Sequence, residues 1–147
     1  ASSTTLKRRG TRDVFETIQL QTQRHKAYDI TAQVKEIVEK SGVKDGICTI
    51  FCPETTAGIC IHSFWDPLGW DDMMDDIQRA FPATVDYRQR TPSAYTAAAA
   101  TKASLMGGVQ SLIVRDGALA FGSSQGILLA EFDGPCRCRR VCVNVME

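Results

Sequence analysis

The sequence predicts a single α+β domain, built on a mainly antiparallel sheet with about three helices. Its 147 residues fit one domain, and 44% apolar against 23% charged residues is ordinary for a globular protein. The predicted elements follow the order β-α-β-β-α-α-β-β-β-β, in which four strands come last in succession. Because a doubly wound parallel sheet needs a helix between its strands, this order argues against that fold. We divide the chain into an N-terminal arm, residues 1–12, and one domain, residues 13–147.

The first predicted elements are a strand and an amphipathic helix. Residues 14–23 are β-prone and partly alternating, which predicts an opening strand. Residues 28–40 change to a helical period, with Asp29 or Thr31 as the candidate N-cap. Gly42 is the expected stop, since glycine accepts the left-handed conformation that ends many helices.

The middle of the chain predicts two strands and a second helix. Residues 46–52 form a nearly continuous apolar run, and residues 56–64 follow after a short loop. Residues 71–81 carry an apolar stripe at helical spacing, which is typical of a core-facing helix. Loop signals dominate residues 82–95.

The last third predicts a helix and four strands. Residues 96–106 are alanine-rich and end before two glycines. The Asp116-Gly117 pair indicates a hairpin between residues 109–114 and 118–122. Two further strands are predicted at residues 126–132 and 139–145; in the second, valines alternate with other residues, as expected for one buried face.

Composition excludes several classes of function. Seventeen basic and seventeen acidic residues cancel, so no overall field favours nucleic acid or an anionic membrane. No apolar run approaches the roughly 20 residues that cross a bilayer. Residues 1–10 are polar and basic and lack the apolar core of a signal peptide, so we expect a cytoplasmic protein.

Six cysteines are present without a CxxC pair, which supports a structural zinc site only weakly. In the absence of a secretion signal, the pattern favours reduced, mostly buried thiols that act as small hydrophobes. Disulfides or metal ligation are the alternatives.

Several polar residues are candidates for a site, each with a structural alternative. His62 is either a satisfied, partly buried histidine or a ligand or acid/base group. Glu54 follows a proline at a strand end, so it is either an exposed loop carboxylate or a functional group. Thr55 and Thr56 either bind phosphate or begin a strand.

The same two readings apply further along the chain. Lys102 and Ser104 either meet an anionic ligand or lie on a solvated helix face. Asp66 fits a cap, and Gln125-Gly126 fits a close backbone approach. An arginine cluster near the C-terminus either binds phosphate or, as the pattern favours, lies on an outer or subunit-facing strand; its members are Arg137, Arg139 and Arg140.

A set of short segments extends over about residues 14–146: Tyr28-Asp29-Ile30-Thr31, Thr55-Thr56-Ala57-Gly58-Ile59, Asp66-Pro67, Asp72-Met73, Lys102-Ala103-Ser104-Leu105, Gly107, Asp116-Gly117, Gly122, Gln125-Gly126-Ile127 and Glu131. Together these segments resemble the YjbQ family, whose members are described as secondary thiamine-phosphate synthases. The resemblance implies an α+β fold, a homotrimer and a modest thiamine-phosphate synthase activity.

The chain departs from this family at its histidines. Three positions at which the family has histidine hold Glu54, Gln89 and Ala100, and a family tryptophan is replaced by Ser124. In the family these imidazoles resemble a reactive or metal-binding centre. A Glu, His and Gln set is a poor transition-metal site, so we expect no metal site and no tight binding of a transition metal.

Three hypotheses for the function remain open, and the sequence does not decide whether the chain is an enzyme. It is a YjbQ-like protein that lacks or nearly lacks the synthase activity, a remodelled enzyme for a phosphorylated small molecule, or an oligomeric interaction protein. The candidate catalytic residues are Glu54, His62 and Gln89. The candidate ligand-binding residues are Thr55, Thr56, Ser63, Asp66, Lys102, Ser104, Gln125 and Gly126.

Overall fold

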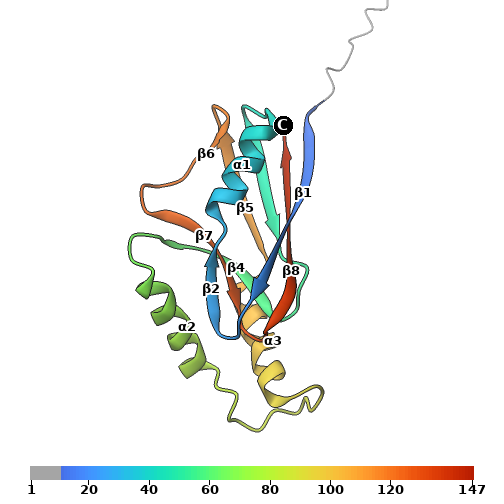
Figure 1. Ribbon diagram of the computed structural model, residues 1–147, viewed down its shortest axis with the longest axis vertical. Coiled ribbons are helices and arrows are strands. Elements are labelled where there is room, and N and C mark those ends of the chain that lie inside the picture. Colours follow the sequence, from blue (N-terminus) through green and yellow to red (C-terminus); the bar gives the residue numbers. More distant parts are fainter. Residues whose placement is uncertain (1–10) are drawn as a thin grey trace, which may run out of the picture.

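The protein is described by a computed structural model that covers residues 11–147, in which two antiparallel sheets face each other (Figure 1). Sheet A has five strands in the order β1 (Asp13–Thr22), β8 (Cys136–Met146), β3 (Gly46–Phe51), β5 (Val109–Arg115) and β6 (Ala118–Leu119). Sheet B has three, in the order β2 (Lys26–Asp29), β7 (Gln125–Glu131) and β4 (Ala57–Ser63). The α+β prediction is confirmed. The predicted arm, residues 1–12, lies mostly outside the described residues.

The main core lies between sheet A on one side and sheet B together with α1 (Thr31–Ser41) on the other. It joins Ile50 and Val143 of sheet A to Ile59, Ile127 and others of sheet B. The opposite face of sheet B is covered by α2 (Leu68–Ala80) and α3 (Ala94–Met106), which build a second core with Leu128. Because β7 is covered on both faces, its residues read as a continuous apolar run rather than an alternating one.

The first helix, α1 (Thr31–Ser41), begins three residues later than the sequence predicts. Residues 26–29 instead form β2, which pairs with β7. The N-cap position is held by Ile30, so neither Asp29 nor Thr31 is the N-cap; Asp29 instead accepts hydrogen bonds from the backbone and hydroxyl of Thr31. Gly42 ends the helix with φ of 70°, as predicted.

The remaining boundaries differ by a few residues. Helix α2 begins at Leu68, where the Asp66 carboxylate accepts a hydrogen bond from the Leu68 N–H at 3.0 Å. Helix α3 begins inside the predicted loop because the Ser93 hydroxyl accepts the Thr96 N–H, a regular N-cap. Strand β6 is only two residues long, and β8 starts at Cys136.

The β5–β6 hairpin forms at the predicted turn. Arg115 pairs with Ala118, which leaves Asp116 and Gly117 as a two-residue loop. Their φ angles of 51° and 77° are both positive, as a type I′ turn requires.

All six cysteines are free thiols, but their burial is uneven. Cys48 and Cys52 are buried and Cys60 is half-buried, and burial raises the pKa of each thiol to about 11. The three cysteines of β8 are half-buried or exposed, so the prediction of mostly buried thiols is wrong for that strand.

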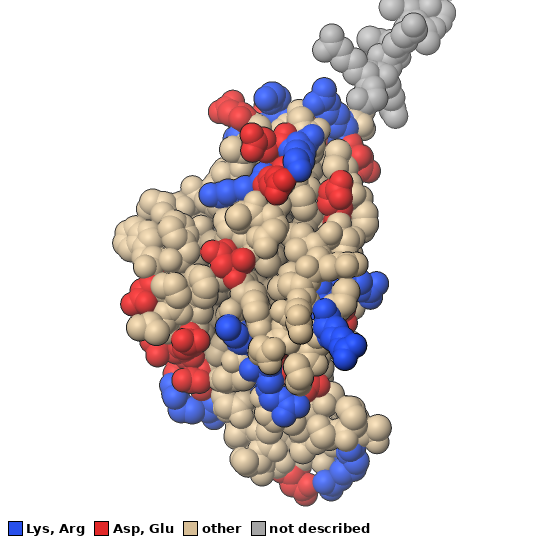
Figure 2. All heavy atoms as spheres, viewed as in Figure 1, with Lys and Arg blue, Asp and Glu red and all other residues tan. Residues whose placement is uncertain are grey.

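The surface mixes positive and negative side chains on the face shown in Figure 2, in keeping with the balanced charge. Among residues 11–147, no helix is long and apolar enough to cross a membrane.

Candidate functional site

A cleft of about 600 Å³ opens between the loop after β3 and the C-terminal half of α3. We call it the Glu54 cleft, because Glu54 is its charged residue. It is lined by Phe51, Cys52, Pro53, Glu54, Thr55, Ala57, Ala100, Ala103, Ser104, Gly107 and Gly108.

Backbone hydrogen bonds hold the two sides of the Glu54 cleft together. The Cys52 N–H donates to the Gly108 carbonyl at 2.8 Å, and the Ile59 N–H donates to the Gly107 carbonyl at 3.0 Å. A Cβ at Gly58 would lie only 3.0 Å from the Gly107 carbonyl oxygen, so the close approach needs a glycine there. The relative position of the two cleft walls is therefore set by backbone hydrogen bonds of the fold and not by the side chains that line the cleft.

A buried ion pair lies behind the loop that carries Glu54. Arg139 of β8 donates to both carboxylate oxygens of Glu131 of β7, at 2.6 and 2.8 Å. The Thr22 hydroxyl adds a third donor to Glu131 at 2.6 Å, and Arg139 also donates to the Thr56 hydroxyl at 2.8 Å. Glu131 and Thr22 are fully buried, so this network ties sheet A to sheet B. The hydrogen bonds to Glu131 raise the pKa of Arg139 above its usual range.

Glu54 is held at the edge of this network by two arginines. Its carboxylate lies 3.4 Å from an Arg139 nitrogen and 3.8 Å from an Arg140 nitrogen. The Glu54 side chain is 21% exposed, so one part of it lines the cleft and another contacts the buried ion pair. Glu54 is thus a carboxylate of fixed position with its charge already partnered.

Four of the predicted site residues lie at this end of the molecule. Glu54, Thr55 and Ser104 line the cleft, and Thr56 is buried behind it. The Ser104 hydroxyl donates to the Ala100 carbonyl at 2.8 Å, which satisfies its proton within α3.

His62 and Ser63 lie at the opposite end of β4, where they pair with Gly126 and Gln125 of β7. The His62 Nδ1 is 3.0 Å from the Ser63 carbonyl oxygen, and its ring faces the start of α2 near Gly69. His62 lies five positions along β4 from Ala57 at the cleft, a distance of about 17 Å. The structure therefore does not bring His62 together with Glu54.

The other predicted residues at this far end serve the backbone. Asp66 accepts the Leu68 N–H, and the Gln125 side chain accepts the Gly122 N–H at 2.8 Å. A Cβ at Gly126 would lie 3.2 Å from the Thr31 hydroxyl, so a close approach exists here as the sequence suggests.

Lys102 and Gln89 lie outside the Glu54 cleft lining. Lys102 is almost fully buried in α3, with its ammonium on the Gln78 side-chain oxygen and 5.6 Å from the centre of the Tyr95 ring. Burial lowers the pKa of Lys102. Gln89 lies on the exposed loop before α3 and donates to the Thr91 carbonyl at 3.0 Å.

Sequence reasoning missed the Arg139–Glu131 pair. It placed Arg139 on an outer or subunit-facing strand, but Arg139 shares the buried face of β8 with Val141 and Val143 and is 9% exposed. The signal was present in the alternation, since residues 139, 141 and 143 have the same parity. Within residues 11–147, no three His, Cys, Asp or Glu side chains converge as a metal ion needs.

Comparison with known proteins agrees with the fold. The family model described as UPF0047 protein YjbQ-like matches residues 16–147. The chain belongs to this YjbQ-like family. It is 34% identical to the UPF0047 protein YugU of Bacillus subtilis, over 90% of this chain and 99% of that protein. It is 38% identical to a UPF0047 protein of Methanocaldococcus jannaschii, over 78% and 80% of the two chains.

Two solved structures of this YjbQ-like family are also close. A YbjQ-like protein of unknown function from Sulfolobus solfataricus gives a TM-score of 0.87 at 31% identity, covering 93% of this chain and 99% of that one. An uncharacterized YjbQ/UPF0047 protein from Clostridium acetobutylicum gives 0.82 at 40% identity, covering 88% and 98%.

The positions that the resemblance assigns to the family's histidines lie at different places relative to the Glu54 cleft. Of the three positions that the resemblance assigns to family histidines, 54 and 100 face the same cleft. One holds a carboxylate bound to arginine and the other a methyl group. Gln89 lies on the loop before α3 and does not line the cleft.

Proposed function

We propose that this YjbQ-like chain binds a small molecule in the Glu54 cleft and has little or no thiamine-phosphate synthase activity. The observation that carries the proposal is the state of Glu54, whose carboxylate is engaged by Arg139 and Arg140 at the cleft edge. Two arginines thus already engage the carboxylate that stands where the resemblance assigns a family histidine. The side chain of Ala100, across the cleft, is a methyl group without a polar atom.

The cleft also gives little support to a phosphorylated ligand. Lys102, the lysine predicted to meet an anionic ligand, holds its ammonium on Gln78 and does not line the cleft. The cleft lies against the C-terminal end of α3, where the helix dipole is negative, and Glu54 adds a carboxylate. We therefore favour an uncharged or cationic ligand over a phosphate.

The activity is tested by complementation of a thiamine-phosphate synthase-deficient strain. We expect no rescue by the chain as it stands while immunoblotting shows soluble protein. Rescue that is lost in Glu54→Ala would overturn the proposal and favour the remodelled enzyme.

The histidine positions are tested by restoring them. The triple variant Glu54→His, Gln89→His, Ala100→His should bind zinc in stoichiometric amount by plasma mass spectrometry of dialysed protein. A matched variant with Gln125→His in place of Ala100→His should bind less, since Gln125 lies at the far end of β7. Equal zinc in both would show that the cleft is not where the family histidines meet.

A second proposal concerns self-association through the outer face of sheet A. The strand register places exposed apolar side chains side by side on this face, which helices α2 and α3 do not cover; they are Phe15, Ile47, Phe51, Val109, Ile113 and Met146. A contiguous apolar patch of this kind marks a protein contact surface. It supports the homotrimer that the family resemblance implies, and Phe51 would bring the contact to the edge of the Glu54 cleft.

The oligomer is tested by light scattering after size-exclusion chromatography. We expect the intact chain to have three times the monomer mass and the double variant Ile47→Lys, Ile113→Lys to be a monomer. Leu105→Lys, which removes a comparably exposed apolar side chain from α3, is the matched control and should stay oligomeric.

The free thiols fit a reducing compartment, so the cytoplasm is the location we propose.

A further inference from the structure

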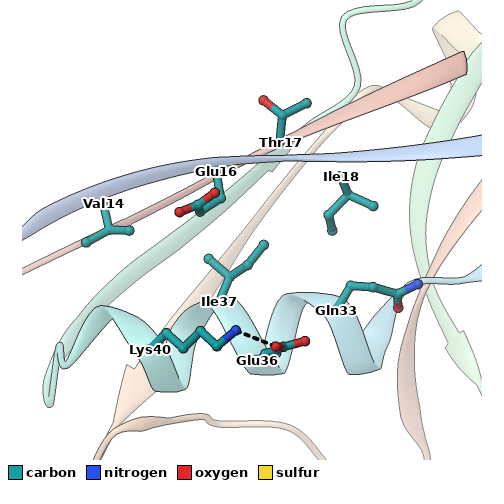
Figure 3. Close-up of a pocket in the computed structure, with 8 residues that line it drawn as sticks. All are labelled: Val14, Glu16, Thr17, Ile18, Gln33, Glu36, Ile37 and Lys40. Atoms are coloured by element: carbon teal, nitrogen blue, oxygen red, sulfur yellow. Dashed lines mark hydrogen bonds and ion pairs between the residues drawn. The ribbon is translucent and has the colours of Figure 1, made fainter.

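A groove of about 420 Å³, which shares no lining residue with the Glu54 cleft, runs between β1 and α1 (Figure 3). It is lined by Val14, Glu16, Thr17, Ile18, Gln33, Glu36, Ile37 and Lys40. We propose that this β1–α1 groove binds an extended peptide segment with a basic side chain, which adds to sheet A as a further strand beside β1.

The first support is the position of β1 in the sheet. It has ten residues, forms one edge of sheet A, and pairs only with β8 among the strands of residues 11–147. A long edge strand presents unpaired backbone N–H and C=O groups, which are a template for another strand. Peptides that add to such an edge obtain affinity from main-chain hydrogen bonds and specificity from pockets for alternate side chains.

The second support is the shape of the groove. Val14, Glu16 and Ile18 point from β1 toward α1, and Ile37 points back from the helix (Figure 3). Ile18 and Ile37 belong to the main core, so the groove has a fixed apolar floor. An added strand would place every second side chain over this floor, with about 7 Å between successive ones.

The third support is the charge of the two walls. Lys40 of α1 is hydrogen-bonded to Glu36 at 2.5 Å, and the carboxylates of Glu36, Glu16 and Glu39 raise its pKa. Glu16 on the opposite wall makes no ion pair of its own within residues 11–147. The groove lining thus has two carboxylates and one ammonium group, and a basic side chain of the peptide opposite Glu16 would neutralise the remaining negative charge.

The same charge argues against a second copy of this chain as the occupant. Antiparallel pairing of β1 with another β1 about residue 16 would place two Glu16 carboxylates opposite each other, which is destabilising in a sheet. The complementary segment instead has an apolar residue, a basic residue and an apolar residue at every second position, opposite Val14, Glu16 and Ile18.

The probe is a fluorescein-labelled heptapeptide, Thr-Val-Thr-Lys-Thr-Val-Thr, which places the lysine between two valines on one face. Its binding to the intact chain is measured by fluorescence anisotropy. A matched peptide with a central glutamate is the comparison. We expect saturable binding of the lysine peptide and at least about tenfold weaker binding of the glutamate peptide, because like charges across an interface are strongly unfavourable. Hydrogen exchange should show slower exchange of the β1 amides when the lysine peptide is bound.

The Glu16→Lys variant should reverse the preference between the two peptides. Glu39→Lys makes the same charge change on α1 outside the groove lining and should leave the ratio within about twofold, since an exposed charge that does not face the peptide is screened by solvent and salt. Circular dichroism checks that both variants fold. Absence of saturable binding, or an equal effect of both variants, would overturn the proposal.

Two other occupants are distinguished by the same measurements. If removal of residues 1–10 strengthens peptide binding by about tenfold or more, that segment of the chain is the occupant, and an external peptide is not. Self-association that Glu16→Lys abolishes would assign the groove to a second copy. Either result would overturn the proposal in its present form.

Discussion

The two ends of the β4–β7 pair use polar residues in different ways. At the end formed by Ala57 and Glu131, charged side chains are buried and bind each other across four segments of the chain. At the end formed by Ser63 and Gln125, polar side chains are mostly exposed and satisfy backbone groups within a few residues. The Glu54 cleft lies at the first end only.

This difference teaches where sequence motifs are informative. Asp66 and Gln125 each accept a backbone N–H from a residue two or three positions away, and for Asp66 the sequence predicted this cap. Arg139 and Glu131 act on partners in other strands, so the alternation along β8 indicates that Arg139 is buried but not which group it pairs with. Long-range charge pairs therefore shape the candidate site, and local caps support the opposite end.

The largest expected effect tests the buried pair. Arg139→Met should lower the free energy of unfolding by about 3–5 kcal/mol, because it leaves the Glu131 carboxylate buried without its cation. Urea denaturation followed by circular dichroism measures it. Arg140→Met removes the neighbouring, half-exposed arginine and should cost less than about 1 kcal/mol.

A double variant distinguishes the loss of the charge pair from the loss of side-chain packing as the cause of the lower stability. Arg139→Met combined with Glu131→Met replaces both charges by apolar groups and should recover most of the lost stability. If the double variant is as unstable as Arg139→Met, the contrast between the two ends does not rest on the charge pair.

Much of the fold follows from local chemistry. The Asp116-Gly117 turn and the glycine after α1 are found at the predicted residues, because one residue type decides each backbone conformation. Strand β2 was missed because four residues form a strand only when β7 is available to pair with them. Residues 28 and 29 therefore looked like the first turn of α1.

The candidate site was predictable only in part. Glu54, Thr55 and Ser104 come together as the resemblance to the family suggests, whereas His62 lies at the other end of β4. Residue type alone cannot place a histidine, since its role depends on which strand end it occupies. The parity of Arg139 with the buried valines was the one overlooked signal for the ion pair.

A smaller effect is expected at Lys102, which is buried close to the first end but makes no ion pair within residues 11–147. Lys102→Met should raise the free energy of unfolding by about 1–2 kcal/mol at neutral pH, because it removes an unpaired, desolvated charge. The buried pKa lies below the ordinary value of 10.5, so the native protein binds fewer protons there than the unfolded chain. The stability of the native protein therefore rises with pH between the lowered pKa of Lys102 and the ordinary value of 10.5.

The difference in free energy of unfolding between the Lys102→Met variant and the original chain should therefore be largest near pH 7 and decrease as the pH approaches 10.5. Urea denaturation at several pH values measures this. A gap that stays constant with pH, or a loss of stability in the variant, would mean that Gln78 and Tyr95 compensate the charge fully, and that unpaired charge is tolerated at this end.

The smallest effect is expected at the far end, at Gln125. Gln125→Ala removes the acceptor of the Gly122 N–H, and because this group is exposed, water replaces the lost partner. The free energy of unfolding should fall by only about 0.5–1 kcal/mol, the net value of a single neutral hydrogen bond. Ligand binding in the Glu54 cleft should be unchanged, since Gln125 lies at the opposite end of the pair. A loss beyond that range, or weaker binding in the cleft, would show that the two ends of β7 are energetically coupled and that the contrast between them is not real.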